Sequence, residues 1–167
     1  PLVKINYALK ATARVQVFSK LELYNPSGSV KDRTGLYMVQ DALLKGTLKK
    51  GSTIIEATAG NTGLGIAFAA LNLGIKVIFV VPEKFSEEKQ TLMKALGAQI
   101  IHTKRENGML GAAAKAKELV ASTPNALSLE QFKNLANPKA HYETTGVEIY
   151  EDLDGKIDYL VAGAGSG

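Results

Sequence analysis

Lys31 stands where a lysine is not expected, in the first turn of a predicted helix. The segment 30–45 carries Leu36 and Val39 at helical spacing, and it is followed by Gly46, a residue typical of helix ends. A helix N-terminus has partial positive charge, which favours Asp or Glu and disfavours a cation. The same field favours an uncharged amine, which can form a Schiff base with a carbonyl compound. Lys31 is therefore a candidate nucleophile, with a solvated surface lysine as the alternative.

A second candidate site is the glycine-marked segment 56–82, which reads as strand, turn, helix and strand. The residues that mark its turn are Glu56, Thr58, Gly60, Asn61, Thr62, Gly63 and Gly65. Backbone N–H groups at a glycine turn before a helix, together with hydroxyl and amide side chains, suit a carboxylate or phosphate oxygen. Close packing alone would explain Gly63 and Gly65. It would not explain the polar side chains, so we expect an anion site here.

A nicotinamide-binding Rossmann domain is the alternative interpretation of the same segment. Its fingerprint is G-x-G-x-x-G, whereas the glycines at 60–65 follow the order G-x-x-G-x-G. Glu83 does follow the second strand at a distance that suits a ribose contact. The glycine order disfavours a nicotinamide site and leaves it as the alternative.

A third glycine-rich segment, AGAGSG at 162–167, follows the apolar segment 157–163, which we predict to be a strand. A glycine loop at the end of a strand normally leads into a helix whose N-terminus holds a phosphate. The segment is therefore a candidate phosphate site, with a simple tight turn as the alternative. Because no helix follows Gly167, we expect a fragment of a longer protein that by itself binds such a ligand poorly and has little activity.

Apolar segments with β character alternate with helical patterns along the chain. The predicted strands are 15–22, 53–58, 76–82, 99–103, 126–129 and 157–163. The predicted helices are 30–45, 62–73, 86–97, 110–121 and 139–152. Continuous apolar strands that alternate with helices are typical of a parallel sheet covered on both faces. The predicted fold is therefore α/β, with three layers and a mainly parallel sheet between helices.

Composition disfavours several other classes of protein. The 167 residues carry a net charge of +4, but the lysines are scattered and lack interleaved aromatic residues, which disfavours a nucleic-acid partner. Cysteine is absent, so disulfides and thiolate metal sites are excluded, and His102 and His141 have no metal-ligand spacing. Apolar runs such as 77–81 are far too short to span a membrane. No leader pattern opens the sequence, so we expect a cytoplasmic protein.

Four motifs, in their order along the chain, resemble the cysteine synthase / cystathionine β-synthase family, the fold-type II pyridoxal-phosphate enzymes. They are NPSGSVKDR at 25–33, TAGNTGLGIA at 58–67, QFKNLANPKAHYETTGVEI at 131–149 and GAGSG at 163–167. The resemblance runs essentially from end to end. The segment VPEKFSEEK at 81–89 is more similar to the cystathionine β-synthase branch than to cysteine synthases.

The resemblance implies roles for particular residues. Lys31 would hold pyridoxal 5′-phosphate as a Schiff base and later move protons at Cα of the substrate, and Asn61 would bind the 3′-oxygen of the cofactor. The substrate carboxylate would be bound by Thr58, Gly60, Asn61, Thr62 and Gln131. The cofactor phosphate would be bound by Gly165, Ser166 and Gly167. Two features depart from the family pattern: Ala59 replaces a usual serine, and the phosphate loop and the partner of the pyridine nitrogen are not complete within this sequence.

The resemblance also implies a fold like that of the tryptophan synthase β subunit, and a reaction. Residues 1–34 would begin the large cofactor domain, 35–145 would form a smaller mobile domain, and 146–167 would return to the large domain. The implied reaction is β-replacement on O-acetylserine or serine by a thiol or sulfide, giving cystathionine or cysteine, in a homodimer with no nucleic-acid or membrane partner. A β-eliminating serine/threonine dehydratase is an alternative within the superfamily, and a non-catalytic remnant is another.

Overall fold

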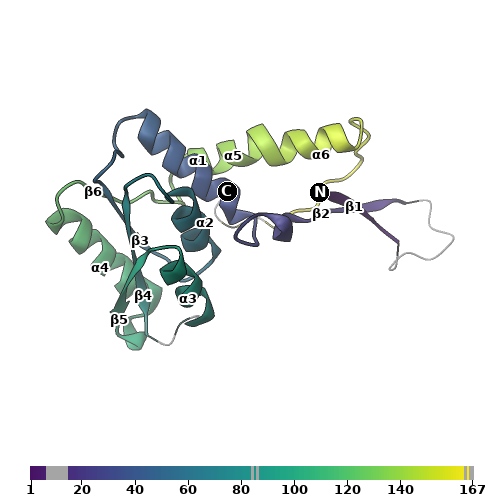
Figure 1. Cartoon of the computed structure of the whole chain (residues 1–167). Coiled ribbons are helices and arrows are strands. Elements are labelled where there is room, and N and C mark those ends of the chain that lie inside the picture. Colours follow the sequence, from purple (N-terminus) through teal and green to yellow (C-terminus); the bar gives the residue numbers. More distant parts are fainter. Residues whose placement is uncertain (7–14, 84, 86, 164, 166–167) are drawn as a thin grey trace.

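Within residues 1–6, 15–83, 85, 87–163 and 165, which the computed structural model describes, the chain forms two sheets (Figure 1). β1 (Leu2–Ile5) and β2 (Val17–Lys20) form an antiparallel pair. The second sheet is parallel, has the order β5-β4-β3-β6, and consists of β3 (Thr53–Ala57), β4 (Lys76–Pro82), β5 (Gln99–Thr103) and β6 (Ala126–Leu127).

Six α-helices lie in the described part of the chain: α1 (Lys31–Leu44), α2 (Asn61–Ala69), α3 (Glu87–Ala95), α4 (Gly108–Ser122), α5 (Ala136–Ala140) and α6 (Gly146–Asp152). Two short 3-10 turns are η1 (Glu22–Tyr24) and η2 (Arg105–Asn107). A π-helical turn, η3 (His141–Thr145), joins α5 to α6, so that the three form one long rod beside α1 (Figure 1).

The parallel sheet is buried on both faces, as its apolar strands predict. Neighbouring residues of β3 point to opposite faces: Ile54 joins the core formed with α1, α2 and α3, and Ile55 joins the core formed with α4. Phe79 and Val80 of β4 divide in the same way, and all four side chains are fully buried. Figure 1 shows α4 across the sheet from α2. The three-layer α/β prediction is therefore confirmed.

The strand predicted at 157–163 is not formed. A strand is held by hydrogen bonds to a neighbouring strand, and none of the strands in the described residues pairs with this segment. Its apolar side chains lie at the surface instead, with Tyr159 90% exposed and Val161 94% exposed. The prediction of a strand here is wrong for this structure, because apolar composition alone does not supply a pairing partner.

Three other strands differ from the prediction. The strand predicted at 15–22 shortens to β2, and Glu22 begins η1 instead. The strand predicted at 126–129 shortens to β6, because the backbone after Leu127 turns towards the carboxylate of Glu56. β1 has no counterpart in the prediction, since four residues give too short a pattern to recognise. It exists by pairing with β2, in a register that sets Leu2 opposite Lys20.

Two helices also differ at their ends. α2 stops at Ala69, earlier than predicted, because the chain leaves the helix through Asn72 and Gly74, whose φ angles are 61° and 66°. The last helical segment begins earlier than predicted, at Ala136, whose N–H donates a 2.9 Å hydrogen bond to the side-chain oxygen of Asn134. This bond gives a partner to one of the backbone N–H groups that the start of a helix leaves unpaired.

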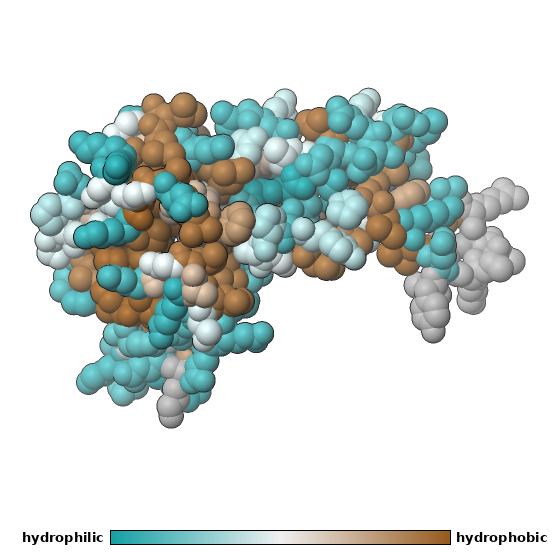
Figure 2. Space-filling model, viewed as in Figure 1, coloured by the Kyte–Doolittle hydropathy of each residue, from teal (hydrophilic) through white to brown (hydrophobic). Residues whose placement is uncertain are grey.

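The surface combines charged areas with exposed apolar side chains, and Figure 2 shows hydrophobic residues reaching the surface between hydrophilic ones. Besides the segment 157–163, Leu23 and Tyr24 of η1 are more than half exposed, at 63% and 68%. None of the helices in the described ranges is long and apolar enough to cross a membrane. The division into domains at residues 34 and 145 stays a prediction.

Candidate active site

Lys31 lies in the first turn of α1, as predicted, and is the first residue of that helix. The turn before it is closed by Asp32, whose carboxylate accepts hydrogen bonds from the N–H of Ser27, at 2.7 Å, and from the hydroxyl of Ser27. The N–H of Lys31 donates to Oγ of Ser29 at 3.2 Å. Gly28 allows the turn with a φ of 84°, which residues with a Cβ atom rarely adopt. The first motif therefore builds a tight turn that fixes where the half-buried lysine leaves the backbone.

α1 and α2 cross in direct backbone contact. A Cβ atom on Gly65 would lie 2.3 Å from the carbonyl oxygen of Lys31, and a Cβ atom on Gly35 would lie 2.4 Å from the carbonyl carbon of Gly65. Cβ atoms do not approach backbone atoms so closely, so both positions need glycine. The crossing brings the lysine motif against the helix that begins at the 58–62 loop. The first two sequence motifs are thereby brought together.

The loop 58–62 supplies hydroxyl and amide side chains at the start of α2, and the space beside Gly60 is open. Thr58 and Thr62 are buried, with 6% and 7% of their surface exposed, whereas Asn61 is exposed. The N–H of Gly60 donates to Oγ1 of Thr58 at 3.4 Å, and a Cβ atom on Gly60 would meet no atom within 4 Å. A helix start with these groups suits an anion. The binding of a substrate carboxylate by these residues stays a prediction.

Gly63 and Gly65 are packing residues. The N–H of Gly63 donates to the carbonyl of Gly60 at 3.1 Å, and a Cβ atom on Gly63 would lie 2.6 Å from the terminal methyl of Met93 in α3. The packing explanation of these two glycines is confirmed: Gly63 packs against Met93 of α3, and Gly65 packs against the start of α1. A role for the N–H groups of this turn in binding a ligand stays a prediction.

Gln131 lies beside Thr62, although 69 positions separate them: the hydroxyl of Thr62 donates to Oε1 of Gln131 at 2.7 Å. The side-chain amide of Asn137 in α5 donates to the backbone carbonyl of Gln131 at 3.0 Å. The hydroxyl of Thr34 in α1 donates in turn to Oδ1 of Asn137 at 2.9 Å, and both of these side chains are fully buried. The network joins three helices around the predicted carboxylate site. Thr34 and Asn137 were not predicted, because a polar residue on a helix carries no sign of its distant partner.

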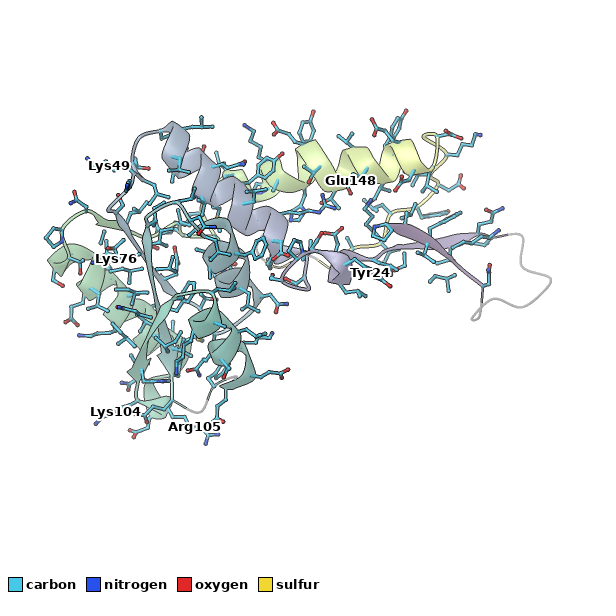
Figure 3. The ribbon with its side chains drawn as sticks, in the orientation of Figure 1. Tyr24, Lys49, Lys76, Lys104, Arg105 and Glu148 are labelled. Atoms are coloured by element: carbon cyan, nitrogen blue, oxygen red, sulfur yellow. The ribbon has the colours of Figure 1, made fainter. Side chains whose placement is uncertain are left out.

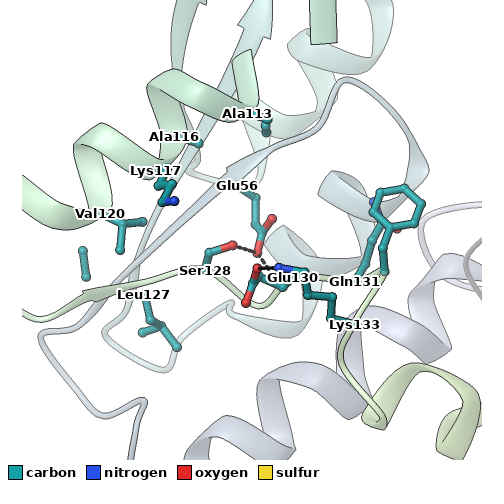
Figure 4. A pocket seen from close by; sticks show the side chains of 13 residues that line it. Glu56, Ala113, Ala116, Lys117, Val120, Leu127, Ser128, Glu130, Gln131 and Lys133 are labelled. Carbon is teal, nitrogen blue, oxygen red and sulfur yellow. Dashed lines mark hydrogen bonds and ion pairs between the residues drawn. The ribbon is translucent and has the colours of Figure 1, made fainter. Parts of the chain in front are cut away.

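Glu56 organises the segment that precedes Gln131 (Figure 4). Its Oε1 accepts hydrogen bonds from the hydroxyl of Ser128 at 2.9 Å, from the N–H of Leu129, and from the N–H of Glu130 at 3.0 Å. Burial raises the pKa of the Glu56 carboxyl, and the three hydrogen bonds oppose that shift because they stabilise the charged form. The carboxylate lies at the wall of a cavity of about 650 Å³ next to α4.

A cluster of charged side chains ties α1 to η1, β2 and α6. Nε of Arg33 lies 2.7 Å from the carboxylate of Glu22, and Nη1 of Arg33 lies 2.6 Å from the carboxylate of Glu148. Nζ of Lys20 lies 2.8 Å from the same Glu148 carboxylate, and Figure 3 shows Glu148 on α6. The hydrogen bond from Arg33, supported by that from Lys20, lowers the pKa of Glu148 to about 2. The cluster holds Arg33, two positions after Lys31, and so fixes the start of α1.

His141 lies within electrostatic reach of the lysine. Burial lowers the pKa of His141, and the positive charges of Lys31 and Arg33 lower it further. Its Nδ1 is 3.0 Å from Oγ1 of Thr145, one turn later in the same helical rod. In the ranges described, no three His, Asp or Glu side chains gather in a way that could hold a metal ion.

The predicted phosphate segment is only partly described. A Cβ atom on Gly165 would meet no atom of the described residues within 4 Å. Ser166 and Gly167 lie outside the described residues. The phosphate contacts of all three residues stay predictions.

The described residues fit pyridoxal phosphate. The fit rests on an amine at the start of one helix and on hydroxyl and amide donors at the start of the helix that crosses it. A lysine amine can hold a carbonyl cofactor as a Schiff base, and hydroxyl, amide and N–H donors at a helix start can bind its anionic groups. The chain belongs to the pyridoxal-phosphate dependent enzyme family, whose model matches residues 1–167. That match favours the pyridoxal-phosphate interpretation over the nicotinamide-binding alternative.

Similar proteins agree with this assignment. The chain is 55% identical over 153 residues to the O-acetylserine dependent cystathionine beta-synthase of Bacillus subtilis (strain 168), covering 92% of this chain and 50% of that protein. It is 45% identical to cysteine synthase A of Escherichia coli (strain K12), covering 100% of this chain and 51% of that protein. The crystal structure of O-acetylserine dependent cystathionine beta-synthase from Helicobacter pylori matches with a TM-score of 0.91 at 44% identity, over 100% of this chain and 55% of that one. The chain thus spans about half the length of these relatives.

Proposed function

We propose that the protein catalyses a pyridoxal-phosphate-dependent β-replacement, in which a thiol or sulfide replaces the β-substituent of O-acetylserine or serine to give cystathionine or cysteine. The observation that carries the proposal is the crossing of α1 and α2 at Gly35 and Gly65, which sets the lysine motif against the 58–62 loop. Relatives named as cystathionine beta-synthases and cysteine synthases support the same reaction.

In this proposal Lys31 holds the cofactor and acts as the base that moves the proton at Cα of the substrate. Its place in the first turn of α1 supports the role, because the hydrogen bonds of Asp32 and Ser29 fix where the side chain leaves the backbone. Pyridoxal phosphate, when bound, supplies an electron sink for the electrons left at Cα. Asn61 binds the 3′-oxygen of the cofactor, and Gly165, Ser166 and Gly167 bind its phosphate.

The substrate carboxylate is bound by Thr58, Gly60, Asn61, Thr62 and Gln131. Binding at this loop orients the Cα–H bond towards the lysine, and orientation of this kind lowers the barrier to proton transfer. The geometry supports the grouping, since Thr62 and Gln131 are already in contact and the space around Gly60 is open. Ala59 is buried and offers no hydroxyl, so donors come from its neighbours.

The test uses the protein expressed from its complete gene. Incubation with pyridoxal phosphate and reduction with borohydride should place a stable label on Lys31, and Lys31→Ala should lose both the label and the reaction. Lys45→Ala, at the other end of the same helix, is the matched control and should keep both. A label on another lysine would overturn the site. Release of pyruvate with formation of neither cystathionine nor cysteine would favour the dehydratase alternative.

We also propose that the protein works as a cytoplasmic homodimer. Exposed apolar side chains support an interface: Leu23 and Tyr24 lie on η1, and Tyr159 and Val161 lie in the segment before the phosphate loop. Sedimentation equilibrium of the full-length protein tests the assembly. A single monomeric species across micromolar concentrations would contradict it.

A further inference from the structure

We infer that Glu56 is a positioning residue for amino-acid binding: its carboxylate fixes the turn at 128–130 and thereby holds Gln131 against Thr62. The inference rests on the proposed function, in which Gln131 and Thr62 contact the substrate carboxylate. Glu56 acts through the turn, and it is not itself a residue of the carboxylate site.

One oxygen atom of Glu56 gathers three successive residues of the turn. Oε1 accepts from the hydroxyl of Ser128 at 2.9 Å, from the N–H of Leu129, and from the N–H of Glu130 at 3.0 Å (Figure 4). A carboxylate that is partly removed from water is costly unless donors surround it, and the donors of the half-buried Glu56 come from a single short segment. The carboxylate and the turn therefore hold each other in place.

The turn needs such a partner because its last residue is strained. Glu130 has a φ of 49°, in the left-handed region that residues with a Cβ atom avoid. Its N–H is one of the three groups that Glu56 binds, and the next residue is Gln131. The strained residue directs the chain so that Gln131 faces Thr62, and Glu56 holds that conformation.

The other hydrogen bonds to Gln131 involve its own carbonyl and its side chain, which lie beyond the turn at 128–130. Asn137 binds its backbone carbonyl, at 3.0 Å, and Thr62 binds its side chain, at 2.7 Å. Asn134 also holds this turn, since its side-chain amide donates to the carbonyl of Leu129 at 2.9 Å and its N–H donates to the carbonyl of Glu130 at 3.0 Å. These contacts bind carbonyl oxygens, whereas Glu56 binds the N–H groups of Leu129 and Glu130. Loss of the Glu56 charge should therefore loosen residues 128–130, which lead into Gln131, and leave the start of α5 intact.

The experiment is a double-mutant cycle in the full-length protein loaded with pyridoxal phosphate. Glu56→Gln keeps the size of the side chain and removes its charge, and Gln131→Ala removes the residue that it positions. L-serine affinity is measured from the change in cofactor absorbance, and the fraction of Lys31 that carries cofactor is measured by borohydride labelling. We expect Glu56→Gln to weaken L-serine binding about 10-fold in the wild-type background. In the Gln131→Ala background the effect should fall below about twofold, with Lys31 labelling unchanged throughout.

Two further variants keep the test decisive. Ser128→Ala removes one of the three donors and should weaken L-serine binding about threefold. If Glu56→Gln does not fold, Ser128→Ala takes its place in the double-mutant cycle. Glu118→Gln, on the exposed face of α4, is the matched control and should change nothing. Unchanged affinity, or an equal loss with and without Gln131, would overturn the inference alone. Absence of cofactor on Lys31 in the wild-type protein would overturn the proposed function, and this inference with it.

Discussion

The hydroxyl of Thr62 donates a 2.7 Å hydrogen bond to Oε1 of Gln131, and this bond closes the start of α2 onto a segment 69 positions further along the chain. A hydroxyl has one hydrogen to donate. A carboxylate that binds here must therefore take this donor from Gln131, or receive other donors from the same loop. The position of Gln131 and the binding of an amino acid are coupled for that reason.

Thr62→Val removes the hydroxyl while keeping the shape of the side chain. A lost hydrogen bond to a charged group costs roughly 1.5–3 kcal/mol, so amino-acid binding should weaken by about 10- to 100-fold. The measurement is a titration of the cofactor absorbance of the full-length protein with L-serine. Thr91→Val, which removes an exposed hydroxyl that donates to the carbonyl of Glu87 at 3.0 Å, is the control. Equal affinities in the two variants would contradict a role for Thr62.

Gly65→Ala should destabilise the fold, because the added Cβ atom would lie 2.3 Å from the carbonyl oxygen of Lys31. Overpacking of this kind costs roughly 1–3 kcal/mol, and here the neighbour is backbone that cannot rotate away. Urea unfolding measures the change. Gly60→Ala is the control, since a Cβ atom there would meet nothing within 4 Å, and it should cost less than about 1 kcal/mol. A Gly65→Ala variant as stable as the control would show that the helices separate easily.

Glu148 should make stability depend on pH in the acid range. Its pKa falls from 4.5 to about 2 in the folded protein, mainly because of the hydrogen bond from Arg33. A lowered pKa means that the carboxylate stabilises the folded state above pH 4.5, and that this contribution is lost as the pH falls towards about 2. Urea unfolding of the wild-type protein and of Glu148→Gln should therefore differ at pH 7 and converge through this window. If the two proteins differ in unfolding free energy by the same amount at pH 7 and at pH 2, the lowered pKa of Glu148 is refuted.

Asn137→Ala should unfold the protein more easily, because it leaves the hydroxyl of Thr34 and the carbonyl of Gln131 without their shared partner. Both Asn137 and Thr34 are fully buried, so water cannot replace the lost amide without opening the structure. The expected loss of unfolding free energy is about 1–3 kcal/mol. Gln40→Ala, an exposed amide on α1, serves as the control and should change stability little.

The local features of this protein could be predicted because each depends on residues close together in the chain. The turn before Lys31 needs Gly28 and the side chain of Asp32, which lie within one motif. The buried strands β3 and β4 and the helices between them follow from continuous apolar segments and helical spacing. The segment 157–163 shows the limit of such patterns, since it is as apolar as a strand and forms none.

The sequence by itself determined the α/β layers, the lysine at a helix start, the polar loop after β3 and the family. Only the tertiary structure decided which side chains meet. Arg33 binds Glu148 across 115 positions, and Glu56 holds a turn more than 70 positions away. Such contacts depend on how closely two helices cross and on where a chain reverses, and these are set by the whole core rather than by neighbouring residues. For that reason Glu56 could be marked from the sequence as unexplained, while its partners became visible only in the folded chain.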